Sequence, residues 1–152
     1  MAFELDTFLP YRLSVAAGRV SRRFAERYQR EADISIPEWR VLAHLAHEGS
    51  VSVREIHARV DMDKSRVSRA AARLELAGHV RKLEHPEDRR LVSLSLTAQG
   101  QELMERLAGI ADGFQAELVA ELGGSVADLD RMLGRLMAGD DISSKDDHDD
   151  TL

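Results

Sequence analysis

The segment from His85 to Gly100, HPEDRRLVSLSLTAQG, interrupts a chain whose apolar residues otherwise recur with helical spacing. Within it, LVSLSLT alternates apolar with small polar residues, as a half-buried strand does. The preceding residues, HVRKLE, also favour a strand, and PEDRR separates the two. The sequence therefore predicts a charged β-hairpin between helices, with PEDRR at its tip.

Four helices are expected before this hairpin. The first covers about residues 7–31, and the second begins in SIPEW, where Ser35 can cap free amides and Pro37 suits the first turn, and ends near His47. Ser52 and Asp63 can cap two further helices, over about 53–60 and 64–77. Gly78 follows where a left-handed backbone is usually needed. Two short capped helices followed by a hairpin form the pattern of a winged helix–turn–helix.

Two helices are expected after the hairpin. Apolar residues from Leu103 to Leu118 recur at steps of 4, 3, 4 and 4, close to the spacing of a helix–helix seam, and a last helix runs from Val126 to about Ala138. These stripes exceed what a small wing domain can cover, so we expect a homodimer. The fold class is mainly α with a small β-hairpin. We expect one domain over residues 1–138, in which 35–97 bind DNA and 7–34 and 98–138 form the dimer interface. Residues 139–152 are expected to be an acidic disordered tail outside this domain.

Charge is unevenly distributed along the 152 residues. The net charge is −6, yet residues 35–90 carry 11 basic and 9 acidic groups, whereas residues 140–152 carry 1 and 6. The acidic total therefore does not exclude a polyanionic partner for the central part. No long apolar run indicates a membrane span, and MAFELDTFLPYRL lacks the pattern of a secretory signal, so we expect a cytoplasmic protein. The sequence has no Cys, which excludes disulfides and thiol switches.

The helix expected over 64–77 has two distinct faces. At about 100° per residue, Val67, Ala71 and Leu74 share one side. Cationic and hydroxyl side chains gather well away from it: Ser65, Arg66, Ser68, Arg69 and Arg73. Guanidinium groups can bind phosphate or the paired acceptors of guanine, and small hydroxyls can reach phosphate or base edges. The simpler interpretation is a solvated basic face, but the capped turn before this helix and the hairpin after it favour a recognition helix in a major groove.

At the hairpin tip, Arg89 and Arg90 stand beside Asp88. A long cation on a narrow β-ribbon can enter a minor groove, while a neighbouring carboxylate can hold the tip in shape. The alternative is a polar turn whose charges only keep it soluble.

Three segments of the chain resemble, in order and spacing, the signature regions of the MarR family of bacterial transcription regulators. They are IPEWRVLAHL, MDKSRVSRAAARLELAGHVRK and PEDRRLVSLSLTAQG. The resemblance covers about residues 7–138. It implies a homodimer of winged helix–turn–helix domains whose first and last two helices form the dimer interface. It also implies a repressor that binds a palindromic operator in double-stranded DNA and is released by a small ligand. With no Cys, the peroxide-sensing branch of the family is excluded.

Carried over by position, the resemblance assigns DNA binding to two groups of residues. Ser65, Arg66, Ser68, Arg69 and Arg73 lie on the recognition helix, and Asp88, Arg89 and Arg90 lie on the wing. Asp63 departs from the family's usual Ser or Thr cap; it suits the helix dipole but repels a close phosphate. AAARLELAGH carries few bulky groups, so the groove contact depends on few side chains.

What the regulator senses is less constrained by the sequence. A small aromatic or phenolic compound is the ligand class we expect, and no cofactor is implied. Trp39 either borders a ligand crevice or simply anchors the second helix in the core. His44 and His47 lie one turn apart, but without a clear third ligand they do not predict a metal site.

Two other function classes remain to be weighed. No nucleophile-and-base constellation or phosphate-binding glycine loop appears, so an enzyme is not expected. A winged-helix protein-interaction module is the alternative, and it has no need for arginines in register with a basic wing. The acidic tail is either a solvating end or a competitor of DNA for the basic face.

Overall fold

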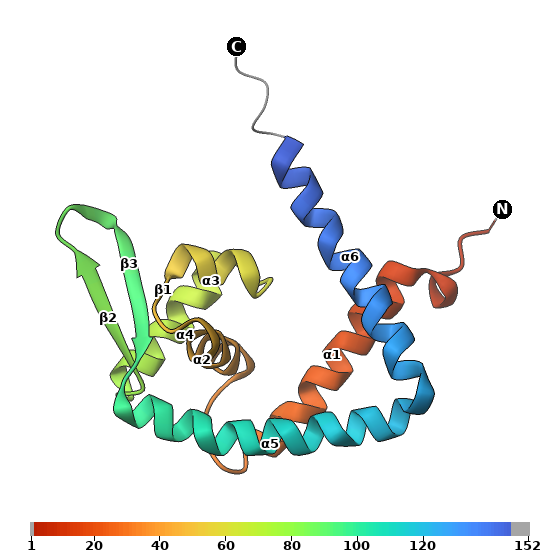
Figure 1. Ribbon diagram of the computed structural model, residues 1–152, viewed down its shortest axis with the longest axis horizontal. Coiled ribbons are helices and arrows are strands. Elements are labelled where there is room, and N and C mark those ends of the chain that lie inside the picture. The colour runs from red at the N-terminus through yellow and green to blue at the C-terminus, as the bar shows by residue number, and fades with distance from the viewer. Residues whose placement is uncertain (1, 147–152) are drawn as a thin grey trace. The chain divides into compact units, whose positions relative to one another are not determined.

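The computed structural model describes residues 2–146, and for residues 89–91 and 139–146 it describes the backbone only. Figure 1 shows the elements, which in chain order are η1 (Leu5–Thr7), α1 (Leu9–Tyr28), α2 (Ile36–Glu48), β1 (Val51–Ser52), α3 (Val53–Arg59), α4 (Lys64–Leu76), β2 (Val80–His85), β3 (Asp88–Leu96), α5 (Ala98–Leu122), η2 (Gly123–Ser125) and α6 (Val126–Asp146). The mainly helical fold class with a small hairpin is confirmed. The sheet also contains one short strand, β1.

The chain divides into two compact units, Met1–Asp112 and Gly113–Leu152. The first holds α1 to α4, the sheet and the beginning of α5. The second holds the end of α5, η2 and α6. The division falls inside α5.

Side-chain caps begin three consecutive helices at the positions expected from the sequence. The Ser35 hydroxyl accepts from the Glu38 amide at 3.3 Å, and the Ser52 hydroxyl accepts from the Glu55 amide at 3.1 Å. In both caps the serine hydroxyl also donates to the glutamate carboxylate. These bonds satisfy amides that a helix start leaves free, and they fix where α2 and α3 begin.

Helix ends agree with the sequence at Gly78 and differ from it in α6. Gly78 has φ of +83°, the left-handed conformation expected after α4. The last helix was expected to end near Ala138, but α6 continues to Asp146. Once a helix is nucleated each further residue adds one backbone hydrogen bond, so a helix can outlast its apolar stripe. Residues 147–152 of the predicted tail lie outside the described part of the chain.

The sheet has the strand order β1-β3-β2, with both pairs antiparallel. His85 pairs with Asp88, so the tip contains only Pro86 and Glu87, and the expected tip PEDRR is too long. Proline suits the second position of a four-residue turn, which lets β3 begin at Asp88. The register shifts between Glu84 and His85, and the extra residues 89–91 of β3 form a bulge there.

The core of the first unit forms where α2, α3 and α4 meet the sheet and α5. Leu42, Ile56 and Leu74 are fully buried at its centre. Leu94 of β3 and Leu107 of α5 close it from the other sides. Packing of this kind fixes the orientation of α4 relative to the hairpin (Figure 1).

Candidate nucleic-acid interface

Helix α4 begins at a charged cap. The Asp63 carboxylate accepts from the Arg66 amide at 2.8 Å, and its other oxygen lies 3.5 Å from Nε of Arg66. The carboxylate therefore has a cation beside it, which offsets the repulsion of phosphate expected from an acid at this position. One edge of the Arg66 guanidinium is used in this contact.

The predicted apolar side of α4 is buried, and its members are Val67, Ala70, Ala71 and Leu74. All five residues predicted to bind DNA from this helix are exposed, namely Ser65, Arg66, Ser68, Arg69 and Arg73. They do not form one uniform face. At 100° per residue Ser65 and Arg69 point directly away from the core, Ser68 lies toward the hairpin, and Arg66 and Arg73 lie on the opposite flank.

Arg73 also has a structural partner. Its Nε lies 3.2 Å from Oε1 of Glu38, a residue only 9% exposed in α2. The same Glu38 oxygen accepts from the Ser35 hydroxyl at 2.9 Å. Arg73 thus fastens α4 to the start of α2, and part of its guanidinium stays exposed.

A groove of about 520 Å³ separates α4 from the hairpin. Its lining residues are Ser52, Val53, Arg54, Lys64, Ser68, Ala71, Lys82, Glu84 and Val92. Three cations, Arg54, Lys64 and Lys82, face this groove against one carboxylate, Glu84. These three cations were not predicted from the sequence, although strand alternation could have found Lys82, because it shares a face with the buried Val80.

The hairpin is held closed near its tip by His85, whose Nε2 lies 2.7 Å from the Ser93 hydroxyl. Asp88 is exposed at the start of β3. Arg89 and Arg90 follow it in the same strand, and their side chains lie outside the described part of the chain. The structure therefore places the predicted wing residues in the strand after the turn rather than at the turn itself.

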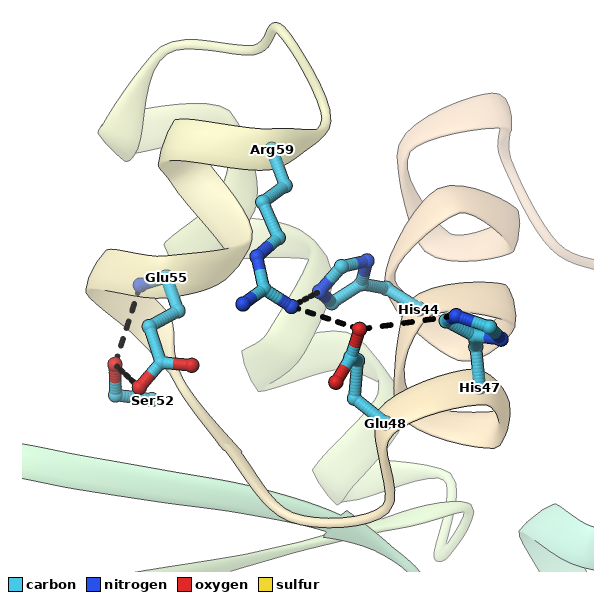
Figure 2. A network of polar contacts seen from close by, with 6 residues as sticks. All are labelled: His44, His47, Glu48, Ser52, Glu55 and Arg59. Atoms are coloured by element: carbon cyan, nitrogen blue, oxygen red, sulfur yellow. Dashed lines mark hydrogen bonds and ion pairs between the residues drawn. The ribbon is translucent and has the colours of Figure 1, made fainter. Parts of the chain in front are cut away.

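Polar contacts join α3 to the end of α2 (Figure 2). Nη1 of Arg59 lies 2.9 Å from Oε1 of Glu48 and 3.4 Å from Nε2 of His44. Nε2 of His47 lies 3.8 Å from the same Glu48 oxygen. Burial first, and then the Arg59 guanidinium, lowers the pKa of His44, so its ring is held neutral and can accept from Arg59.

Trp39 anchors the second helix in the core, which is one of the two roles considered from the sequence. Its ring packs against Phe24 at 4.9 Å and stacks on Tyr28 at 5.6 Å, which anchors α2 to α1. Burial raises the pKa of Tyr28 to about 12. Trp39 also lines an open pocket with Arg40, Ala43, His44, His47 and Val60.

Among the side chains that the structure describes, no three from His, Asp or Glu come together in a way that could hold a metal ion. No helix in the described part of the chain is long and apolar enough to cross a membrane.

Comparison with known proteins identifies the family. The sequence model of the MarR family matches residues 32–91. An HTH-type transcriptional regulator of Mycobacterium tuberculosis (strain CDC 1551 / Oshkosh) is 30% identical over 134 residues, covering 88% of this chain and 93% of that protein. The HTH-type transcriptional repressor IacR of Pseudomonas putida is 29% identical over 132 residues, covering 86% of this chain and 78% of that protein.

The same relationship extends to the fold. The solved structure of a MarR/EmrR family transcriptional regulator from Acinetobacter sp. ADP1 matches 91% of this chain and 99% of its own, with a TM-score of 0.80 and 26% identity. Members of this family are transcription regulators rather than enzymes. The capped helices α3 and α4, the hairpin after them and these relatives agree: the chain belongs to the MarR family of winged helix–turn–helix transcription regulators.

Proposed function

We propose that the protein is a repressor that binds double-stranded DNA with α4 in the major groove and the hairpin as the wing. The observation that carries this proposal is the groove between α4 and the hairpin, which Arg54, Lys64 and Lys82 line. On α4, Ser65 and Arg69 point away from the core and would meet base edges. Asp88, Arg89 and Arg90 would act from the wing, as the sequence predicts.

The groove suits the sugar-phosphate backbone of one strand. A strand that passes between a helix in the major groove and a wing beside it places its phosphates against both elements. Lys64 and Lys82 would neutralise phosphates there, while the Ser68 hydroxyl can donate to a phosphate oxygen. Contacts of this kind set orientation and affinity, and they carry no sequence information themselves.

The apolar side chains that each unit leaves exposed support a homodimer. In the first unit these include Leu9 and Leu13 of α1, and in the second Met132, Leu133 and Leu136 of α6. A two-fold dimer would bind a palindromic operator with half-sites about one helical turn apart.

The pocket beside Trp39 is the site whose side chains best suit an aromatic acid as the ligand. An aromatic ring with Arg40, His44 and His47 around it can stack on an aromatic compound and pair with its carboxylate. Two structures that share this fold, at 24% and 21% identity, concern NadR in complex with 4-hydroxyphenylacetate and the regulation of BpsR by 6-hydroxynicotinic acid. An aromatic acid that binds here would release the operator.

The groove is tested by Lys82→Ala, with a duplex enriched by the protein from a random library as operator. Arg81→Ala is the matched control, because the neighbouring residue faces the other side of β2. Lys82→Ala should weaken operator and scrambled duplex alike. It should also reduce the slope of log K against log salt by about 0.9 for each phosphate lost, or about 2 for a dimer.

Unchanged binding and slope in Lys82→Ala would remove the groove from the interface. Failure of the library to yield any enriched duplex would contradict the proposed function, and a winged-helix module for protein contacts would then be the better account.

A further inference from the structure

The outer line of α4 changes from polar to apolar along its length. Ser65, Arg69, Ala72 and Leu76 follow one another at steps of 4, 3 and 4, so they form a single line along the helix. All four are exposed, and Leu76 is the extreme case at 91%. A leucine this exposed gains nothing from the fold of its own chain.

Cations border this line on both sides. Lys64 lies on the flank toward the hairpin, and Arg66 and Arg73 lie on the other. Along the whole of α4 four cations stand against one carboxylate, Glu75, which lies on the hairpin flank beside Leu76. A second apolar surface of the same chain would leave these cations without a partner. A surface of cations with an apolar end is complementary to a groove with apolar groups on its floor and phosphates on its edges, which describes the major groove wherever thymine exposes its 5-methyl group.

Resting on the proposed binding of α4 in the major groove, we propose that Ala72 and Leu76 read thymine methyl groups and so determine part of the operator sequence. Ser65 and Leu76 are about 16 Å apart along the axis of α4, at 1.5 Å per residue. At about 3.4 Å per base pair, this length along the DNA corresponds to about five base pairs. Arg69 would pair with a guanine near the middle of this span. Each half-site then has a guanine followed by thymines toward the Leu76 end.

Contact with a thymine methyl group predicts a preference for thymine over deoxyuridine, which hydrogen bonding cannot produce. Replacing thymine by deoxyuridine removes the 5-methyl group and leaves every donor and acceptor in place. One buried methyl contributes about 0.8 kcal/mol, or about fourfold in affinity. A dimer that loses one such contact in each half-site should bind about 16-fold less tightly.

The test compares operator and its deoxyuridine-substituted form by fluorescence anisotropy, with the operator obtained by selection from a random library. Wild-type protein should prefer the methylated form by about 16-fold for one position per half-site. Leu76→Ala should bind the operator less tightly and lose most of this preference. Leu83→Ala is the matched control, since Leu83 is also exposed, at 59%, but lies on the opposite face of β2 from Lys82 and the groove.

Equal affinity of the wild type for both duplexes would overturn the inference while leaving operator binding intact. The same conclusion follows if Leu76→Ala keeps the full preference for thymine. If no duplex is selected at all, the proposed function itself fails, and the inference fails with it.

Discussion

Gly100, in the first turn of α5, lies against the backbone of His79 in the turn between α4 and β2. A Cβ at this position would overlap the carbonyl oxygen of His79, which belongs to the backbone and cannot move aside easily. Thr97 reinforces the same junction: its hydroxyl donates to the Gly78 carbonyl at 2.6 Å and accepts from the Gly100 amide at 3.1 Å. Two residues thus tie the end of α4 to the start of α5.

Gly100→Ala should therefore destabilise the protein by at least about 1 to 3 kcal/mol, the usual cost of overpacking a rigid site. Urea unfolding followed by circular dichroism measures this. Gly109→Ala on the same helix is the control, because its Cβ would meet nothing within 4 Å. It should stabilise by about 0.5 to 1 kcal/mol through higher helix propensity. Equal stability of the two variants would contradict the packing described at Gly100.

At the scale of elements, the contact between α2 and α3 depends on pH through His44. Its folded pKa lies below the ordinary 6.5 because of burial and then Arg59; Glu48, His47 and Glu55 also face it. The unfolded chain, in which His44 keeps the ordinary pKa of 6.5, therefore binds this proton more tightly than the folded chain does. The stabilising contribution of neutral His44 is therefore present above pH 6.5 and is lost as the pH falls through the folded pKa.

The melting temperature of the wild type should fall between pH 7.5 and 5.5 by more than that of His44→Gln. Glutamine keeps an acceptor for Arg59 but does not titrate. The other histidines are present in both proteins, so the difference isolates His44. Identical pH profiles in differential scanning fluorimetry would show that this ring is protonated equally easily in both states.

The local elements were predictable from the sequence, whereas contacts between elements were not. Ser35, Ser52 and Asp63 cap their helices as predicted, because a cap depends on residues within one turn. Gly78 ends α4 for the same local reason. The ion pair of Arg73 with Glu38 depends on how α4 packs on α2, and no spacing along the chain reveals it.

The candidate site divides in the same way. The exposed face of α4 follows from helical periodicity, and the periodicity located Ser65, Arg69 and their neighbours. The cations of the groove come from three elements that only the tertiary fold brings together. The bulge in β3 could not be predicted from the sequence either, because the register of a hairpin is set by its turn and by pairing across strands.

For the whole molecule, the proposed dimer can be tested through α6. Leu136 is 59% exposed, so Leu136→Glu should leave each unit folded while placing a charge in an apolar interface. Light scattering should give twice the 17.0 kDa chain mass for the wild type and the single mass for this variant. Operator affinity should fall by about 100-fold or more, because the two half-sites are then no longer bound together.

Leu83→Glu is the control for that experiment, since it adds the same charge at a similarly exposed leucine of the hairpin. It should remain dimeric. A wild-type particle of 17.0 kDa at micromolar concentration would contradict the dimer, whatever the variants do.

We propose that the outward face of α4 reads DNA, and Arg69→Ala tests this claim most directly. Arg69 is exposed, and Arg106→Ala removes an exposed arginine from α5 as the control. Fluorescence anisotropy would be measured with operator and scrambled duplex at two salt concentrations. We expect Arg69→Ala to lose about 5- to 150-fold in operator affinity for each subunit, with a much smaller loss on scrambled duplex, so that discrimination shrinks. Wild-type affinity and discrimination in Arg69→Ala would contradict the claim.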